Sequence, residues 1–432
     1  LMKAFNFNLF SPQNMSNLNE KEYLIDDSQN TSELTAYDDN NKLNKQKPIS
    51  AVINFINTSL GSGMLMLPYD MMVCGWALGL CMGVAFCVLS TWTYSILVRV
   101  SKHSHTYQFD KVCNAFFPKW VGILAQICSI VFSFGCTISY VIVIRDNFFF
   151  FQFVNDTPER IALYKNLTLA GIMVLVILPL CFLPSLESLK FNSYLVLIVV
   201  AYLISVCVFV FSDKCAKSAL PPVIPLRKSS DFLKALPLLT QAFNCQYNFL
   251  NIYKELHDKE QNIKKVVVWD TLITTFVYFS IGLFGYFSFG DATKSDILAN
   301  LAQENGLVSQ VANGAMILLM VCHYPIMVYS IRKSLEALFI KDLVKCKIYL
   351  SNVAIIVVAT VIGMFVPEIH YVLSFTSGLA GGTLGFVVTG FLGWKLAKIQ
   401  SNRGGIWEGA FFVVVGILIT GFGFGMAVYE LC

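Results

Sequence analysis

The chain has 432 residues, of which 56% are hydrophobic and only 13% are charged, and its mean hydropathy is +0.63. Soluble globular domains carry about 25% charged residues, so this composition excludes a water-soluble enzyme and a disordered scaffold. The 31 basic and 27 acidic residues nearly balance, which gives no reason to expect nucleic acid as a partner. The main solvent of this chain is therefore expected to be the lipid bilayer.

The first 47 residues differ from the rest of the chain. They are rich in Asn, Asp, Ser and Lys and show no apolar periodicity, which is typical of a disordered tail. The sequence does not identify a partner for this tail. No apolar signal-peptide core is present, so we expect the first apolar segment to direct membrane insertion. We expect one membrane domain over residues 48–432.

Long apolar segments fill residues 48–432. A bilayer core of about 30 Å takes about 20 mainly apolar residues in a helix, and eleven segments meet this length. They are 49–71, 75–98, 120–144, 167–184, 191–212, 232–252, 266–289, 307–330, 348–366, 370–393 and 409–429. The sequence therefore predicts an all-α membrane protein with eleven transmembrane helices.

The basic residues indicate how the chain is oriented. Most of the 31 Lys and Arg residues fall in the first 47 residues and in alternate loops between the predicted spans. Cytoplasmic loops carry the excess of Lys and Arg. We therefore expect a cytoplasmic N-terminus and, with an odd number of spans, the C-terminus on the opposite side.

Two spans at matching positions carry helix-breaking residues. Span one contains Gly61, Ser62 and Gly63 near its middle, and span six opens with Pro237 and has amide side chains at its centre. These spans begin the two halves of a five-plus-five arrangement, where interrupted segments indicate a transporter's binding site. A Gly-x-Gly segment alone is more often a helix-packing device, but the matching defect in span six favours breaks.

A break at mid-membrane leaves main-chain groups unpaired at two helix ends. The carbonyl end of the first half-helix favours a cation, and the N–H end of the second favours an anion. An amino acid zwitterion carries both charges a few ångströms apart. The pattern therefore predicts a protein that binds an amino acid between the two broken spans.

Several motifs resemble a known family. The run from Asn57 to Tyr69, NTSLGSGMLMLPY, is similar to the first-helix signature of the amino acid/auxin permease family. The likeness extends to NIYKEL at 251–256, YSIRKS at 329–334 and YVLSFTSG at 371–378. Within the amino acid–polyamine–organocation superfamily, the chain resembles sodium-coupled neutral and vacuolar amino acid transporters. This resemblance implies a leucine-transporter-type fold of two inverted five-helix repeats plus one helix, with helices 1 and 6 discontinuous, and secondary active transport by alternating access.

The resemblance also implies a set of site residues. The substrate-binding positions are Asn57, Gly61, Ser62, Gly63, Phe243, Asn244 and Gln246. The main chain of the first glycine-rich segment would meet the substrate carboxylate, and the span-six residues would face its amino group. Asn57 matches an asparagine that the family places beside the coupling cation. Ser133, Ser139 and Tyr140 of span three are further candidates for the pocket.

One position departs from the family pattern. In the sodium-coupled relatives a threonine two residues before the span-eight proline helps to hold sodium, and here His323 precedes Pro325 by two. Sodium prefers hard oxygen ligands, whereas imidazole takes up a proton near physiological pH. His323 therefore favours H⁺ over Na⁺ as the coupling ion, with Na⁺ as the alternative and no other cofactor expected. A histidine that only bonds a neighbouring helix is the other interpretation.

Asp70, near the outer end of span one, is unusual for its acidic side chain. It is a candidate outer gate, although an acidic residue at a helix end is more often simply solvated.

The function predicted from these features is a proton-coupled amino acid symporter of the plasma membrane, vacuole or lysosome. The alternatives are a sodium-coupled or uncoupled carrier, a vacuolar exporter, and a membrane amino acid sensor with little flux. A membrane-embedded enzyme is not expected, because the spans hold no paired carboxylates, HExxH or GxSxG motif.

Overall fold

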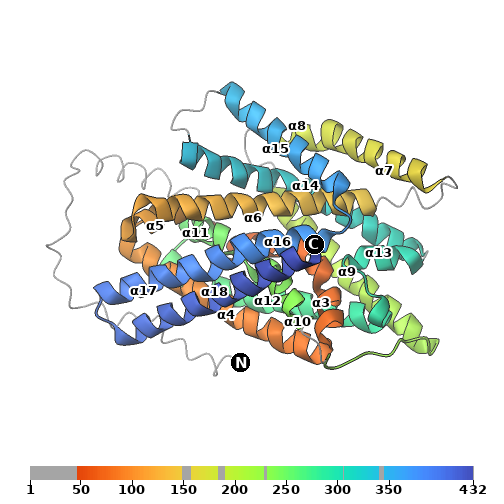
Figure 1. The fold of residues 1–432 in the computed structure, drawn as a ribbon, viewed down its shortest axis with the longest axis horizontal. Coiled ribbons are helices and arrows are strands. Elements are labelled where there is room, and N and C mark those ends of the chain that lie inside the picture. Colours follow the sequence, from red (N-terminus) through yellow and green to blue (C-terminus); the bar gives the residue numbers. More distant parts are fainter. Residues whose placement is uncertain are drawn as a thin grey trace.

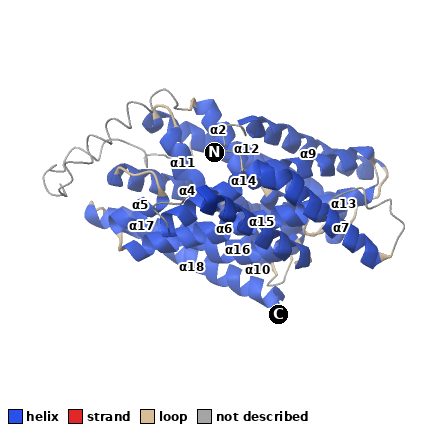
Figure 2. Cartoon of the chain, turned by 90° about the horizontal axis from the view of Figure 1, so that it is seen from above, coloured by secondary structure: helices blue, strands red, loops and turns tan. Residues whose placement is uncertain are grey.

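The computed structural model describes residues 46–147, 157–182, 190–227, 231–304, 306–339 and 345–431. Helices are the only extended regular elements in these segments, apart from one isolated bridge between Gln46 and Leu256 (Figure 2). The predicted disordered tail, residues 1–47, lies almost entirely outside the described part of the chain.

The helices run along the long axis of the molecule and form one bundle (Figure 1). In the first half of the chain they are α2 (Pro48–Ser59), the 3₁₀ helix Ser62–Met66, α3 (Leu67–Cys74), α4 (Trp76–Ser104), α5 (Phe109–Phe116), α6 (Lys119–Asp146), α7 (Pro158–Ile172), the π-helical turn Met173–Ile177, α8 (Leu178–Cys181) and α9 (Lys190–Ala216).

The second half continues with α10 (Phe232–Phe243), α11 (Gln246–Glu255), α12 (Lys259–Phe289), the 3₁₀ turn Gly290–Ala292, α13 (Ile297–Leu301), the 3₁₀ turn Ala302–Glu304, α14 (Leu307–Phe339), α15 (Lys345–Phe365), α16 (Ile369–Thr376), the π-helical segments Ser377–Gly381 and Thr383–Val388, α17 (Thr389–Ile399) and α18 (Arg403–Leu431).

Eight helical segments within the described residues are long and apolar enough to cross a bilayer. They are Trp76–Ser104, Lys119–Asp146, Glu159–Cys181, Ser193–Ala216, Lys259–Ala292, Leu307–Leu338, Ile369–Ile399 and Arg403–Tyr429. The bent pair α2 and α3 supplies a ninth if it is one span. The fourth span begins eight residues earlier than predicted, because Glu159, Arg160 and Lys165 lie inside the helix.

The remaining two predicted spans are present as shorter pieces. The apolar stretch Leu350–Phe365 of α15 covers most of the predicted span 348–366. The predicted span 232–252 is divided between α10 and α11. The described residues of every predicted apolar segment are therefore almost entirely helical, although spans one and six are each divided between two helices and the apolar stretch of α15 is short.

Helices at the centre of the bundle bury more of their surface than helices at its edge. The apolar window of Ile369–Ile399 is 78% buried inside the protein, whereas that of Glu159–Cys181 is only 17% buried. Figure 1 accordingly shows α7 and α8 on the periphery, beside α15. Apolar side chains on such outer helices need no protein partner, since lipid solvates them.

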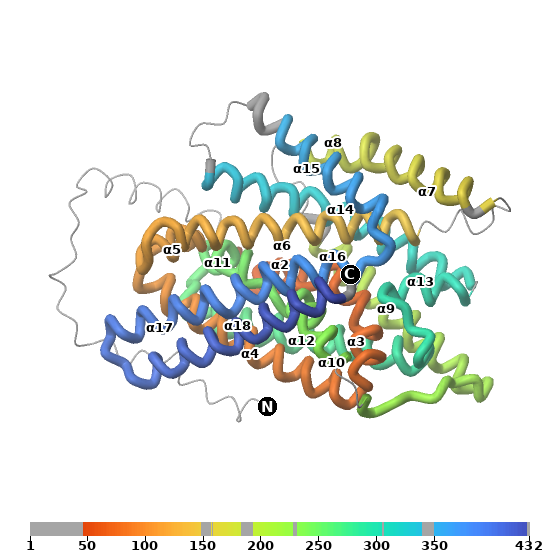
Figure 3. The backbone as a smooth tube through the Cα atoms, in the orientation of Figure 1, coloured from red at the N-terminus to blue at the C-terminus, as the bar shows by residue number. Residues whose placement is uncertain are grey.

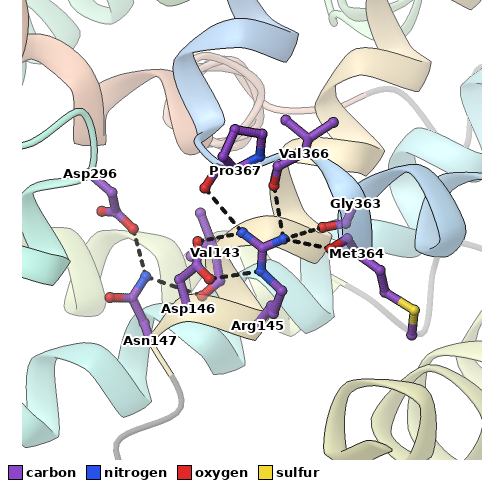
Figure 4. Close-up of polar contacts among 9 residues, drawn as sticks. All are labelled: Val143, Arg145, Asp146, Asn147, Asp296, Gly363, Met364, Val366 and Pro367. Carbon is purple, nitrogen blue, oxygen red and sulfur yellow. Dashed lines mark hydrogen bonds and ion pairs between the residues drawn. The ribbon is translucent and has the colours of Figure 1, made fainter. Parts of the chain in front are cut away.

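Arg145, in the last turn of α6, joins α6 to the linker between α15 and α16. Its guanidinium donates to the carbonyls of Gly363 at 2.7 Å, Met364 at 3.2 Å, Val366 at 2.8 Å and Pro367 at 3.3 Å (Figure 4). Carbonyls at a helix C-terminus lack partners within the helix. Arg145 therefore satisfies the end of α15 and holds it against α6.

Asn147 and Asp296 make a second link at the same end of the bundle (Figure 4). Asn147 Nδ2 donates to Asp296 Oδ2 at 2.6 Å, and the main-chain N–H of Leu298 donates to Asp296 Oδ1 at 3.0 Å, which caps α13. Burial raises the pKa of the Asp296 carboxyl to about 6, although these two hydrogen bonds oppose the rise. The loop before α13 is thus fixed by a carboxyl group that titrates near neutral pH.

Replacing Arg145 by Ala is expected to lower the free energy of unfolding by about 2–3 kcal/mol, since several charge-assisted hydrogen bonds to carbonyls are lost. Thermal unfolding of the purified protein in detergent measures the change. Lys217→Ala is the control, because Lys217 forms an exposed ion pair with Asp213, and such pairs contribute little. Equal melting temperatures for R145A and the wild type would contradict this role.

The stability contributed by Asp296 is expected to fall as pH rises. Its folded pKa of about 6 lies above the ordinary 3.8, so the contribution is complete below pH 4 and is lost as the pH passes 6. Relative to Asp296→Asn, the wild type should lose on the order of 3 kcal/mol between pH 4 and 7. Melting temperatures of both proteins across this range test it, and parallel pH profiles would refute it.

Candidate functional site

The first predicted break is present between α2 and α3. Helix α2 ends at Ser59, and the main chain leaves the helical region at Leu60 (φ −86°, ψ 75°) and Gly61 (φ −107°, ψ −155°). A 3₁₀ helix then begins at Ser62, and the two half-helices meet at an angle of 52°. Leu60 is fully buried and Ser62 is 1% exposed, so the break lies in the interior of the bundle (Figure 3).

The second predicted break separates α10 from α11. Helix α10 ends at Phe243, and Asn244 (φ −96°, ψ 90°) and Cys245 (φ −110°, ψ 10°) connect it to Gln246. Asn244 and Cys245 are both buried. Spans one and six are therefore both discontinuous, as the sequence indicates.

The two breaks lie directly against each other. A Cβ atom added to Gly63 would sit 3.3 Å from the Cα of Ala242 and 3.5 Å from its nitrogen. The main chains of the two half-helices approach so closely that a larger side chain at Gly63 would force them apart. At this glycine the break and the close helix packing occur together.

Tyr278, on α12, connects the two breaks through its hydroxyl. The hydroxyl oxygen lies 2.6 Å from the carbonyl of Ser59 and 2.7 Å from the carbonyl of Ala242. These carbonyls belong to the last turns of α2 and α10, where main-chain acceptors lose their partners. One buried side chain therefore serves both helix ends. The sequence does not reveal it, because a tyrosine in an apolar span has no spacing that identifies its contacts.

Helix α6 forms the opposite wall of the first break. Ser62 Oγ and Ser139 Oγ share a buried hydrogen bond of 2.6 Å. The Tyr140 hydroxyl lies 3.2 Å from the position of a Cβ on Gly61. Ser139 and Tyr140 are thus next to the break, whereas the Ser133 hydroxyl lies 3.5 Å from that of Ser330 on α14.

The three candidate residues of span six point in different directions. Phe243 packs edge-on against the ring of Tyr278, with 5.1 Å between ring centroids. Gln246 is fully buried and donates to the Thr93 hydroxyl on α4 at 2.8 Å. Asn244 has no hydrogen-bond partner for either side-chain atom, and its amide lies next to Gly381 and Gly385. Both side-chain groups of Asn244 and the side-chain oxygen of Gln246 therefore have no protein partner and can bind a ligand.

His323, on α14, contacts Asn57 on α2. The distance between His323 Nε2 and Asn57 Oδ1 is 2.6 Å, and His323 is 2% exposed. A carbonyl oxygen only accepts hydrogen bonds, so Nε2 carries a proton and Nδ1 is left to accept another. The two candidate coupling residues, far apart in sequence, are thus in direct contact.

Asn57 begins a series of polar contacts along α2. Its amide donates to Ser193 Oγ on α9 at 3.5 Å, and Ser193 donates to Asn54 Oδ1 at 3.0 Å. Asn54 in turn donates to Gln46 Oε1 at 2.7 Å. This series ties α2 to α9 between the break and the Gln46 end of the bundle.

Asp70 lies in the first turn of α3 and is 1% exposed. Neither of its carboxylate oxygens has a hydrogen-bond partner. The interpretation of Asp70 as a solvated helix-end residue is therefore wrong, because the packing of α3 into the bundle removes it from solvent. Its part as an outer gate stays a prediction.

Comparison with protein families identifies the chain's relatives. Residues 44–430 match the family described as transmembrane amino acid transporter protein. The chain is 26% identical to amino acid transporter AVT6E of Arabidopsis thaliana, over 82% of this chain and 76% of the relative. It is 27% identical to sodium-coupled neutral amino acid transporter 7 of Danio rerio, over 88% and 87%. It is 26% identical to vacuolar amino acid transporter 5 of Saccharomyces cerevisiae, over 69% of each chain.

Solved structures show a similar fold at low sequence identity. A manganese transporter of Eremococcus coleocola aligns over 96% of this chain and 90% of its own, with a TM-score of 0.54 and 12% identity. A Na⁺-coupled sialic acid symporter aligns over 88% and 90%, with a TM-score of 0.50. Both have the leucine-transporter fold, and a likeness at this identity concerns the fold alone. With a family match that covers nearly all of the described residues, this chain belongs to the transmembrane amino acid transporter protein family, whose members carry solutes and are not enzymes.

Proposed function

We propose that this protein is a proton-coupled amino acid symporter that works by alternating access and binds its substrate at the breaks of spans one and six. The observation that carries this proposal is the contact between the two breaks, with Gly63 against Ala242 and both freed carbonyls at the Tyr278 hydroxyl. Two interrupted helices that face each other at mid-bundle offer one ligand both main-chain N–H groups, which are partially positive, and carbonyls, which are partially negative. The carboxylate and the ammonium group of an amino acid zwitterion are complementary to these two partial charges.

Each charge of the substrate has a proposed partner. The carboxylate would accept from main-chain N–H groups around Gly61, Ser62 and Gly63, where the 3₁₀ helix begins. The ammonium group would donate to the side-chain carbonyl of Asn244, which has no protein partner. Gln246 would be a second acceptor for the ammonium group, because its Nε2 donates to Thr93 while its side-chain oxygen has no protein partner.

The proposed topology has eleven spans in two inverted repeats of five. The broken pair α2 and α3 opens the first repeat, and the broken pair α10 and α11 opens the second. Helix α18 is then the additional span. The distribution of Lys and Arg supports a cytoplasmic N-terminus, which puts the Arg145 end of the bundle on the outer side.

His323 and Asn57 are the proposed coupling residues. Asn57 Oδ1 is occupied by the imidazole N–H at 2.6 Å, so it is not free to ligate a sodium ion in this arrangement. A second proton on Nδ1 would add a positive charge beside α2 and change its contacts with α14. The proton would then bias the conformation of the broken helix, which is what coupling requires.

The names of two relatives favour a second candidate function. Sodium-coupled neutral amino acid transporter 7 of Danio rerio and vacuolar amino acid transporter 5 of Saccharomyces cerevisiae are similar over most of this chain. A sodium-coupled carrier or a vacuolar exporter is therefore the alternative, and the plasma membrane and the vacuole or lysosome are the proposed locations. An amino acid sensor would bind substrate without net uptake, so flux separates it from either transporter.

Replacing His323 by Gln is expected to abolish accumulation driven by an acid gradient. Glutamine keeps an N–H group for Asn57 but cannot take up a proton near neutral pH. The measurement is uptake of a panel of labelled amino acids into proteoliposomes, with sodium, pH and voltage varied independently. Exchange of labelled substrate without a gradient should persist in H323Q.

Two results would contradict proton coupling. One is wild-type uptake that rises with external sodium at fixed pH and ignores a pH gradient. The other is H323Q that still accumulates substrate when the pH gradient is the only driving force.

Removing the Tyr278 hydroxyl tests the shared contact of the breaks. Tyr278→Phe leaves one or both carbonyls without a donor, which costs about 1–3 kcal/mol. We expect amino acid affinity to fall about tenfold if 1.4 kcal/mol of this is lost from the bound state. Equilibrium binding of the substrate found in the uptake panel measures the change.

Tyr286→Phe is the matched control. Tyr286 lies on the same helix, and its hydroxyl accepts from the Ile224 N–H at 3.0 Å, away from both breaks. Y286F should lower stability without changing affinity. Equal substrate affinities in Y278F and the wild type would show that the Tyr278 hydroxyl does not contribute to substrate binding.

A further inference from the structure

Span ten lies between α18 and the broken span six. Its central part consists of the π-helical segments Ser377–Gly381 and Thr383–Val388, and the flanking helices α16 and α17 run beside α18 (Figure 1). π-helical turns within a helix occur frequently at functional sites. Ser377 is fully buried, and its hydroxyl oxygen is hydrogen-bonded to the carbonyl of Pro237 on α10 at 2.7 Å. One face of span ten is thus fixed against the half-helix that leads to the second break.

Two glycines on this face of span ten meet the second break. A Cβ atom added to Gly381 would lie 2.8 Å from Nδ2 of Asn244, and one added to Gly385 would lie 3.1 Å from its Oδ1. Contacts this short force the neighbouring atom to move. The amide of Asn244 therefore occupies space that exists because neither residue has a side chain.

A different pair of glycines in span ten serves its packing against α18. A Cβ atom on Gly378 would lie 2.9 Å from the main chain of Gly423, and one on Gly382 would lie 2.5 Å from the Thr420 hydroxyl. Small residues that let two helices approach are common in membrane proteins. The pair on the other face of span ten differs, because each of its glycines meets the end of a polar side chain.

The amide of Asn244 is confined but unpaired. Asn244 is 3% exposed, and neither its side-chain oxygen nor its nitrogen has a hydrogen-bond partner among the described residues. A buried polar group without a partner is costly, and such a group in a native structure indicates a ligand, an ion or a water. Span ten therefore restricts the position of this amide without using its hydrogen bonds, which leaves both atoms for a substrate.

We propose that Gly381 and Gly385 are positioning residues that hold the Asn244 amide toward the substrate. They act through Asn244 and do not touch the substrate themselves. A methyl group at either position would displace the amide, and the ammonium group of an amino acid would lose one of its acceptors. This positioning role rests on the proposed function, because it requires the substrate to bind at the second break. Span ten thereby sets substrate affinity from outside the two broken spans.

Amino acid binding to the purified full-length chain in nanodiscs tests this role. The probes are tritium-labelled protein amino acids, added one at a time, and the one that the wild type binds most tightly is used for all variants. We expect Gly385→Ala to weaken its binding several-fold, and Gly381→Ala to weaken it further because the added Cβ atom lies closer to the amide. Asn244→Ala removes the acceptor, so the affinity should fall at least about tenfold.

Gly382→Ala is the matched control. It adds the same methyl group to the same part of span ten, but on the face that meets Thr420 of α18. G382A should lower the melting temperature and leave the amino acid affinity unchanged.

A double-mutant cycle separates positioning from a general loosening of the bundle. In the Asn244→Ala background, Gly385→Ala should cause no further loss of affinity, because the amide that it displaces is absent. If G381A does not fold, G385A still decides, since the three atoms nearest to its added Cβ atom all belong to Asn244.

Three results would overturn the positioning role. The first is a G385A variant that binds like the wild type while N244A binds more weakly. The second is additive losses of affinity from G385A and N244A, and the third is unchanged affinity in N244A. A wild type that binds none of the labelled amino acids would instead overturn the proposed function and the positioning role together, so the two failures are distinguishable.

Discussion

Two helices end in the middle of this bundle, and the carbonyls that they release share one hydroxyl donor, that of Tyr278. In a bilayer no water is available to satisfy main-chain groups, so a broken helix persists only where protein or a ligand replaces the lost hydrogen bonds. Tyr278 does this for the Ser59 and Ala242 carbonyls. Gly63 can lie this close to Ala242 because it has no Cβ atom.

The broken helix α2 contacts two buried ionisable side chains on two different helices. Asn57 and Ser59 are two residues apart, so their side chains project about 200° apart around the helix. Asn57 meets His323 on α14, and Ser59 meets Asp270 on α12. A shift of α2 against either neighbour would alter both contacts. The position of this short helix is therefore tied to both His323 and Asp270.

The ends of the bundle are held differently from its centre. Arg145 fixes the linker before α16 with several hydrogen bonds to carbonyls, and Asn147 fixes the loop before α13 with one to Asp296 (Figure 4). Asn54, Ser193 and Gln46 form a sparser series toward the opposite end. At the second break, Asn244 and Gln246 have no partners for their side-chain oxygens. Unsatisfied polar groups in a low-dielectric interior are costly, so two such oxygens at the second break fit a region that binds a ligand.

The sequence by itself determined the helical class, the apolar segments and the two breaks. The length of an apolar segment, and Gly, Pro and amide residues within it, affect the main chain locally. The sequence also drew attention to Asn57 and His323 through the family resemblance. Only the tertiary structure decided that these two touch, that Gln246 turns to Thr93, that Asp70 is buried, and that Tyr278 and Asp270 adjoin the breaks. Such contacts join residues up to 266 positions apart, and they depend on how helices rotate and pack, which the periodicity of an almost wholly apolar span does not encode.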